Sequence, residues 1–162
     1  SDFARMPKPT LRENNIVILL KENVKLLKEL DHSIEIGLNC NSEKIILNSD
    51  KEQISRVFLN LIKNSIESIQ QKAENDSNFS KKISIELSEN DLHINLIIID
   101  NGIGFGKFFK NIKDILTPYF TTKKDGTGLG LSIVNKIIND HNGKIEFIPR
   151  DSGAEIKINF LK

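Results

Sequence analysis

The sequence predicts an α+β fold, in which a mixed sheet is covered on one face by helices to give a two-layer α/β sandwich. The first reason is the order of expected elements: helix, two strands, helix, two strands, long loop, helix and two strands. The second is that six of the nine glycines lie between Gly102 and Gly130, in two clusters typical of turns and loops. The third is the length of 162 residues, which suffices for one domain with its own core.

Residues 1–10 are expected to lie outside this domain, which we place at residues 11–162. The segment SDFARM is interpreted as the end of an upstream helix, and Pro7 and Pro9 favour an extended linker after it. The chain begins without a methionine and stops abruptly, so we expect it to be an excised domain.

An amphipathic helix is predicted from Ile16 to Leu30, with Asn15 as its N-cap. Its buried side is expected to consist of apolar residues at helical spacing, namely Ile16, Leu19, Leu20, Val24, Leu27 and Leu30. Two short strands are predicted next, at residues 33–40 and 43–49, with a two-residue polar link between them.

A long helix is predicted to start after Asp50, its N-cap, and to reach about Gln71. Its residues at helical spacing should face the sheet, namely Ile54, Phe58, Leu61, Ser65 and Ile69. The polar residues 71–82 are predicted to form a loop. Strands at 82–89 and 91–100 should then pair as a hairpin that turns at Asn90 and Asp91.

The last third of the chain is expected to hold an irregular segment, a helix and two strands. These are predicted at residues 105–124, at 129–141, where Asn142 and the following glycine should stop the helix, and at 144–149 and 154–160. This completes a chain in which helices and strands alternate in small groups, as an α+β sandwich requires.

A polar stripe interrupts the long second helix. Asn60, Asn64 and Glu67 are spaced i, i+4 and i+7, so they fall within an arc of about 60° opposite the apolar face, and Lys63 flanks them. A plain solvated surface is the usual reading of such a stripe. Asparagine is a poor helix former, however, and two of them in mid-helix need a reason. An amide oxygen can join the ligand shell of Mg²⁺ without adding charge, which suits a metal already held by phosphates.

The two glycine clusters indicate a bound nucleotide. In the first, IIIDNGIGFG at 97–106, a hydrophobic strand ends in Asp100 and a tight turn. In the second, TKKDGTGLGLSIV at 122–134, a glycine loop feeds a helix. Glycine lets the backbone approach a ligand closely, and the N–H groups at a helix start attract anions. Two such loops in one small domain are expected to hold a nucleotide between them.

Composition excludes several classes of function. The chain is 38% hydrophobic and 28% charged, has no apolar run long enough for a membrane span, and shows no signal peptide. Its net charge of +1 provides no general attraction for nucleic acid. The one cysteine, Cys40, has no internal partner for a disulfide, which fits a reducing compartment.

Four motifs then occur in order: FLNLIKNSIES, DNGIGF, PYFTTK and GTGLGLSIV. They resemble the N box, first glycine box, F box and second glycine box of the histidine-kinase catalytic and ATP-binding domain, a member of the Bergerat-fold ATPases. Each box alone is weak, but the four in this order are specific, and the resemblance covers about Leu11 to Leu161. The sequence FARMP is also similar to the junction below the dimerisation helices of NtrY-type nitrogen-regulation kinases.

The resemblance implies a role for each matching residue. Asn64 matches the asparagine that coordinates Mg²⁺, Asn60 matches the asparagine beside it in the site, and Lys63 would point at phosphate oxygens. Asp100 matches the carboxylate that accepts a hydrogen bond from the adenine amino group. The full cofactor-binding set implied is Asn60, Lys63, Asn64, Asp100, Gly102, Gly104, Phe120, Thr121, Thr122, Lys123, Gly126, Thr127, Gly128, Leu129, Gly130 and Leu131, with Asn60, Lys63 and Lys123 as the catalytic subset.

The loops would share the remaining tasks. Gly102 and Gly104 would let the first loop pass under the adenine, and residues 105–127 would form a mobile ATP lid anchored by Phe120. Three glycines would wrap the phosphates, namely Gly126, Gly128 and Gly130, with Leu129 and Leu131 packed behind them. Lys123 or Lys124 would lie near the γ-phosphate, although a purely solvated position is the alternative for both. Glu67 either supports the site from behind or is only surface charge.

Two departures from the family pattern bear on chemistry. Members often have Gly-Thr in the last strand, where the threonine helps to bind adenine, whereas this chain has Gly153-Ala154. Hydrolytic and serine-phosphorylating relatives carry a glutamate as general base one turn before the metal asparagine. The matching residue here is Asn60, which cannot accept a proton, so we expect slow intrinsic ATPase activity.

The resemblance implies transfer of the γ-phosphate of Mg-ATP to a histidine on a dimerisation domain. None of the three histidines of this chain, His32, His93 and His141, has the acceptor context of that family. The expected partners are therefore a dimerisation domain and a response regulator, and no nucleic acid. We expect a monomeric cytoplasmic fragment of a dimeric kinase anchored in the inner membrane. An anti-sigma-type serine kinase and a non-catalytic nucleotide sensor are the alternatives.

Overall fold

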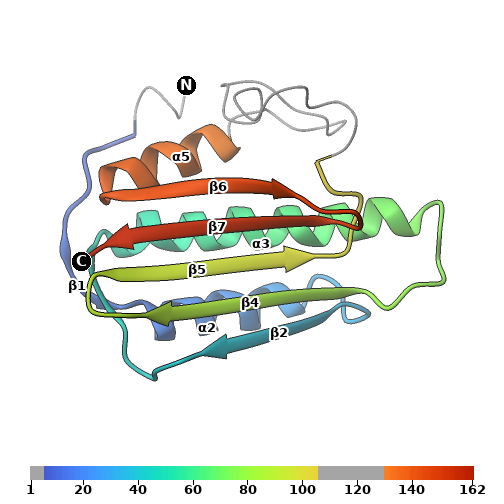
Figure 1. The fold of residues 1–162 in the computed structure, drawn as a ribbon, viewed down its shortest axis with the longest axis horizontal. Helices are drawn as coiled ribbons and strands as arrows, with labels where there is room; N and C mark the ends of the chain where they lie inside the picture. Colours follow the sequence, from blue (N-terminus) through green and yellow to red (C-terminus); the bar gives the residue numbers. More distant parts are fainter. Residues whose placement is uncertain (1–5, 106–129) are drawn as a thin grey trace.

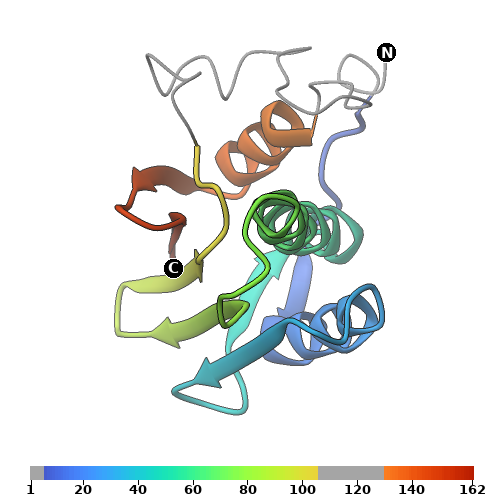
Figure 2. The ribbon, with the colours of Figure 1, turned by 90° about the vertical axis from the view of Figure 1, so that its right-hand side faces the viewer.

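A computed structural model describes residues 6–105 and 130–162 of the chain. Helices α2, α3 and α5 lie on one face of the main sheet (Figures 1 and 2). The described elements are β1 (Arg12–Asn15), α2 (Ile16–Lys28), β2 (Glu35–Cys40), β3 (Ile46–Ser49), α3 (Lys51–Ala73), β4 (Lys82–Glu89), β5 (His93–Asp100), α5 (Gly130–Asp140), β6 (Gly143–Pro149) and β7 (Ala154–Leu161). The predicted two-layer α+β sandwich is confirmed, while residues 106–127 of the predicted lid lie outside the described residues.

The main sheet has five strands in the order β2-β4-β5-β7-β6. The β2–β4 pair is parallel and the other three pairs are antiparallel, so the sheet is mixed as predicted. The β4–β5 hairpin turns at Asn90, whose side-chain oxygen accepts from the N–H groups of Leu92 and His93 at 3.0 and 2.8 Å. This turn fixes His93, the first residue of the central strand β5. Asp100, the last residue of β5, therefore lies at the other end of the sheet.

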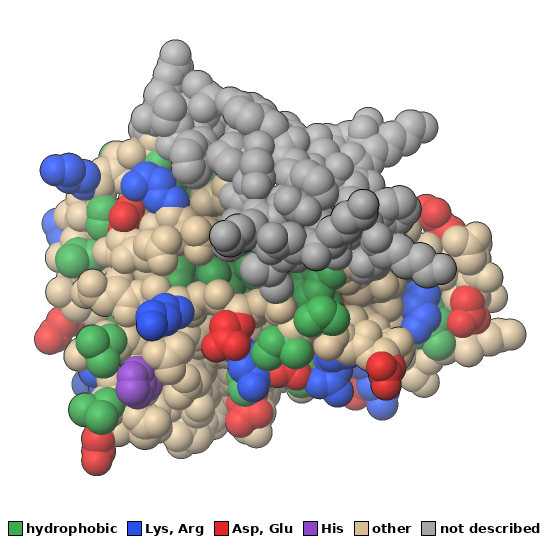
Figure 3. Space-filling view, turned by 45° about the horizontal axis from the view of Figure 1, so that its top comes forward, with side chains coloured by type: hydrophobic (Ala, Val, Ile, Leu, Met, Phe, Trp, Pro, Cys, Tyr) green, Lys and Arg blue, Asp and Glu red, His purple; other side chains and the backbone are tan. Residues whose placement is uncertain are grey.

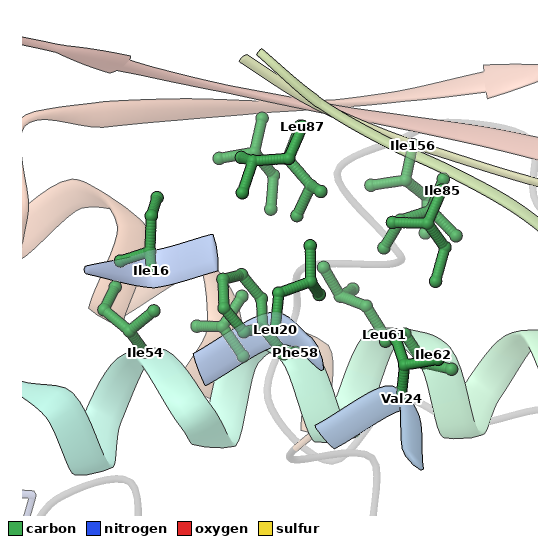
Figure 4. Close-up of a cluster of buried hydrophobic side chains, with 14 of the residues drawn as sticks. Ile16, Leu20, Val24, Ile54, Phe58, Leu61, Ile62, Ile85, Leu87 and Ile156 are labelled. Atoms are coloured by element: carbon green, nitrogen blue, oxygen red, sulfur yellow. The ribbon is translucent and has the colours of Figure 1, made fainter. Parts of the chain in front are cut away.

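The core lies between the helices and the inner face of the sheet (Figure 4). Apolar side chains of α2 and α3 meet alternate residues of the strands, and their burial supplies most of the favourable free energy of folding. The labelled side chains of this cluster are Ile16, Leu20, Val24, Ile54, Phe58, Leu61, Ile62, Ile85, Leu87 and Ile156. All ten are buried, so the face of α3 opposite the polar stripe packs in the core.

The helix caps agree with the sequence prediction. Asn15 caps α2 by accepting from the N–H of Val17 at 3.1 Å, and Asp50 caps α3 by accepting from the N–H of Gln53 at 3.1 Å. After α5, Asn142 takes a left-handed conformation with φ of 58°, which ends the helix one residue before the glycine of the predicted stop. Asparagine tolerates this conformation better than most residues.

In the first 50 residues one prediction is wrong and two features were not predicted. Leu30 is 55% exposed rather than buried, because α2 ends at Lys28 and Leu30 lies beyond its helical repeat. The strand β1 was not predicted, since its sequence RENN has no apolar alternation. The two strands predicted at 33–40 and 43–49 do not share a sheet: β2 pairs with β4, whereas β3 pairs with β1 in a separate two-stranded sheet.

Candidate nucleotide-binding site

The helix α3 presents the predicted polar stripe away from the core. Asn60, Asn64 and Glu67 are half-buried, and Lys63 is exposed. Residues on the core side of the stripe are buried, among them Ser65, which is 2% exposed. The two amides therefore lie at the border of the buried face of α3 and are not fully in solvent.

Asp100 ends β5 and is only 5% exposed. Its Oδ1 accepts from the N–H of Gly102 at 2.9 Å. Burial raises the pKa of the carboxyl group, and this rise is opposed by hydrogen bonds from the Gly102 N–H, the Ser65 hydroxyl and the Ala154 N–H. The single proton of that hydroxyl is shared with the carbonyl oxygen of Leu61, 3.3 Å from Ser65 Oγ. Donors from three segments thus orient a buried carboxylate whose main remaining capacity is to accept.

The turn that follows Asp100 is packed tightly on α3. A Cβ added at Gly102 would overlap the Ser68 hydroxyl and backbone, and the N–H of Ile103 donates to the Ser68 carbonyl oxygen at 3.3 Å. Gly104 has φ of 75°, and a Cβ there would lie 2.6 Å from the carbonyl oxygen of Gly153. A glycine is therefore required at Gly102 by its close approach to α3, and at Gly104 by its close approach to the β6–β7 turn. Their predicted passage under adenine stays a prediction.

Replacing Gly102 with alanine is expected to destabilise the fold by about 1–3 kcal/mol, because the added methyl group must displace helix backbone rather than a flexible side chain. Thermal unfolding of the nucleotide-free chain measures the effect. Gly37→Ala is the matched control, since a Cβ at Gly37 meets no atom within 4 Å. Equal unfolding temperatures for the two variants would contradict the packing described for Gly102.

The opposite wall of the site is the start of α5. A Cβ added at Gly130 would have Asn60 Oδ1 as its nearest neighbour, at 3.9 Å. Leu131 is partly buried and packs against the core, and its predicted place behind the phosphates stays a prediction. The N-terminal end of a helix carries partial positive charge, and the first described residue of α5 is the one next to Asn60.

Three residues at the Asp100 end of the site were given no role in it by the sequence analysis, namely Asn101, Ser65 and Ser68. Asn101 donates from Nδ2 to the Ser80 carbonyl oxygen at 2.5 Å and accepts from the Lys82 N–H at 3.0 Å, which ties the turn to the start of β4. Ser65 was predicted only as a sheet-facing residue. Ser68 Oγ is buried and has no hydrogen-bond partner among the described residues. This hydroxyl lies directly under Gly102, where an added Cβ would overlap it, so it belongs to the packing of the turn on α3.

The structure brings together Asn60, Asn64, Asp100 and the start of α5, with α3 as the common support. Several predicted site residues lie outside the described residues and are not placed, namely Phe120, Thr121, Thr122, Lys123, Lys124, Gly126, Thr127, Gly128 and Leu129. Ala154 is 5% exposed and pairs with Asp100 across β5 and β7, so the missing threonine hydroxyl would have lain beside the carboxylate.

The described residues contain no group of three His, Cys, Asp or Glu side chains placed to hold a metal ion. The predicted Mg²⁺ site does not need one, since it combines the Asn64 amide with phosphate oxygens of the ligand. Within residues 6–105 and 130–162, no helix has the length and apolar character needed to cross a membrane. On the face shown in Figure 3, the described basic and acidic side chains are interspersed, in line with the net charge of +1.

Comparison with known proteins gives a consistent result. The family described as "Histidine kinase-, DNA gyrase B-, and HSP90-like ATPase" matches residues 49–162. An NtrY-like sensor histidine kinase of Rickettsia conorii is 35% identical over 159 residues, which are 98% of this chain and 25% of that protein. The chain thus spans about a quarter of the relative's length, and the resemblance to NtrY-type kinases is confirmed.

Solved structures show the same fold. The nucleotide-free catalytic domain of histidine kinase ThkA has a TM-score of 0.78 and 29% identity, covering 94% of this chain and 95% of that one. ThkA in complex with the response regulator protein TrrA has a TM-score of 0.73 and 26% identity, covering 94% of this chain and 42% of that one. The described domain therefore corresponds to a catalytic domain as it has been isolated in a relative.

Proposed function

This chain belongs to the histidine kinase-, DNA gyrase B- and HSP90-like ATPase family, and we propose that it is the ATP-binding catalytic domain of a sensor histidine kinase. It would deliver the γ-phosphate of Mg-ATP to a histidine on a dimerisation domain outside these 162 residues. The observation that carries the proposal is that Asp100 lies beside Ser65 of α3 and the start of α5 beside Asn60, with Asn64 between these two positions along the helix.

The base would bind at the Asp100 end. A buried carboxylate held by three protein donors accepts from the adenine amino group and rejects a carbonyl at the same position, because both would then be acceptors. This favours adenine over guanine. The Ala154 N–H can support the carboxylate, but the side chain offers no hydroxyl to the ligand, so a water molecule would take that place.

The phosphates would extend along α3 towards α5. Asn64 would hold the metal and Asn60 would line the same site, opposite the first N–H groups of α5. Lys63 is exposed on the same helix and would approach phosphate oxygens. The metal held by Asn64 would supply positive charge that offsets the charge of the phosphates. Asn60, Lys63 and Lys123 would act by positioning and charge stabilisation, which dominate phosphoryl transfer.

The reaction would be an in-line transfer to an imidazole nitrogen. The bond between the γ-phosphorus and the bridging oxygen breaks, a phosphorus–nitrogen bond forms, ADP leaves, and the imidazole loses its second-nitrogen proton to solvent or a neighbouring base. Asn60 cannot take a proton from water, so hydrolysis is slow. The nucleophile must be one that needs no general base at this position, as holds for a neutral imidazole nitrogen.

The histidines of this chain are poor candidates for the acceptor. His141 is 4% exposed; its Nε2 accepts from the Asp50 N–H at 3.0 Å and its Nδ1 lies 2.7 Å from the Ile137 carbonyl oxygen. Both ring nitrogens are therefore occupied. His32 is exposed beside Glu29, and His93 begins β5 at the end of the sheet remote from Asp100. A dimerisation domain would supply the acceptor.

We predict that mixing the chain with the dimerisation domain of its parent kinase and γ-labelled ATP yields phosphohistidine, which is labile in acid and stable in alkali. The control omits Mg²⁺. Acid-stable phosphoserine on a partner would instead favour the anti-sigma-type serine kinase. Tight ATP binding with no transfer at all would favour a nucleotide sensor.

The assembly of the whole protein is part of the same proposal. The parent kinase would be a dimer anchored in the inner membrane, with this domain in the cytoplasm and monomeric when isolated. A response regulator would receive the phosphoryl group from the histidine, and the similar kinase ThkA has been solved in complex with the response regulator protein TrrA. The serine kinase is less favoured because the position of its general base is occupied by Asn60.

A further inference from the structure

The end of the site that would face the base is built from two turns, whose positions relative to each other must stay fixed. One is residues 101–104 after β5, and the other is residues 150–153 between β6 and β7. They touch closely, because a Cβ at Gly153, where φ is 99°, would overlap the backbone of Asp100. Any shift between these turns would move the Asp100 carboxylate relative to the ligand.

Lys72 lies in the last turn of α3, below both turns. Its Nζ donates to the carbonyl oxygen of Asn101 at 3.0 Å and lies 3.4 Å from Ser152 Oγ, one residue of each turn. The same ammonium lies 4.4 Å from the centre of the Phe79 ring, in the segment before β4. A lysine at a helix end is usually solvated, whereas this one is half-buried and has three neighbours from three segments.

We propose that Lys72 is a positioning residue for base recognition, because its ammonium joins both turns to α3 and so fixes the direction of the Asp100 carboxylate. The inference rests on the proposed function of the site. Lysine suits the task because its three N–H donors reach a carbonyl and a hydroxyl at once, while the cation faces an aromatic ring.

The charge of Lys72 acts in the same direction as its hydrogen bonds. Burial raises the pKa of Asp100, whereas the Gly102 N–H, the Ser65 hydroxyl, the Ala154 N–H and finally the positive charge of Lys72 lower it. Lys72 therefore helps to keep the carboxyl group ionised, and only the ionised form is restricted to accepting hydrogen bonds.

Other charged groups near Asp100 face elsewhere. On β7, Glu155 belongs to the outer face of the sheet by strand alternation and pairs with Arg150 at 2.6 Å and Lys157 at 3.5 Å. On β4, the residue opposite Asp100 is Ile83, which is apolar and buried. Among the described residues, Lys72 is thus the charged side chain that acts on this carboxylate.

The test is the affinity of Lys72→Met for ATP, ADP and AMP, measured by calorimetry well below the unfolding temperature. We expect a loss of about five- to tenfold that is equal for the three ligands, because they share the base and differ in phosphates. Lys72→Arg should keep most of the affinity. Lys51→Met, an exposed lysine at the opposite end of α3, is the matched control and should bind like the wild type.

Two further readouts separate positioning from stability. In phosphotransfer with the dimerisation domain, Lys72→Met should raise KM for ATP and leave kcat unchanged. This pattern is expected when an interaction is lost equally from the bound substrate and from the transition state. AMP affinity should fall on acidification, and in the variant this fall should occur at higher pH, because the Asp100 pKa rises further without the nearby cation. We call this fall the acid limb of the AMP affinity. A lower unfolding temperature with unchanged affinities and an unchanged acid limb would overturn the role of Lys72. Failure of the wild type to bind any of the nucleotides would overturn the proposed function itself.

Discussion

Replacing Asp100 with asparagine is expected to lower ATP affinity by about 10- to 100-fold, because the new NH₂ group faces the adenine amino group as donor to donor. The unfolding temperature of the nucleotide-free chain should change little. The variant loses an acceptor for the N–H groups of Gly102 and Ala154 but also removes a buried charge, and these effects oppose one another. Calorimetry with ATP and a thermal unfolding scan without it measure the two quantities.

The same carboxylate makes stability and binding respond to pH in opposite ways. Because the folded-state pKa of Asp100 is raised above the unfolded value, its contribution to stability is full below the unfolded pKa and is lost as pH rises through the folded pKa. ATP affinity should instead fall as pH decreases through the folded pKa, since the protonated carboxyl loses an acceptor. The Asp100→Asn variant shows how much of the pH dependence of ATP affinity comes from titration of ATP itself, because position 100 no longer titrates. Equal ATP affinity in the variant and the wild type at neutral pH would refute the base contact.

Replacing Asn64 with alanine is expected to remove most of the gain in ATP affinity that Mg²⁺ gives, a loss of about tenfold or more from a missing oxygen ligand. The fold should persist, because the Asn64 side chain is on the polar stripe rather than in the core and alanine is the better helix former. Calorimetry with ATP, with Mg²⁺ and then with a chelator, separates the two contributions.

Asn139→Ala offers a matched control for that variant, since Asn139 is an exposed asparagine in α5 and no role in the site is assigned to it. It should keep the full response to Mg²⁺. If Asn64→Ala also retained the Mg²⁺-dependent part of its affinity, the assignment of Asn64 as the metal ligand would be wrong, although the base contact at Asp100 would stand.

The elements that local sequence determines were predicted well. Asp50 and Asn15 are caps as expected, and the apolar face of α3 lies in the core while Asn60 and Asn64 do not. These features depend on helical periodicity and short-range hydrogen bonds, which a single sequence records. Asp100 was also predicted correctly as the end of a buried strand.

Long-range partners were beyond the reach of the sequence. The parallel pairing of β2 with β4 joins segments that are separated by the whole of α3, and nothing in either strand specifies its partner. The same holds for Ser65 beside Asp100 and for Lys72 below the two turns. Their roles follow from where the second half of α3 meets the end of β5 and the β6–β7 turn, which depends on packing of the complete core.

The central claim is that a nucleotide lies against α3, between the turn after Asp100 and the start of α5. The most direct measurement is a two-dimensional amide NMR spectrum of the labelled chain, recorded while Mg-ADP is added. We expect the shifted amides of the described residues to form one continuous surface that includes Asn64, Gly102, Gly130 and Ala154. Shifts confined to the opposite face of the sheet, around Ile97 and Lys157, or no shifts at saturating ligand, would contradict the claim.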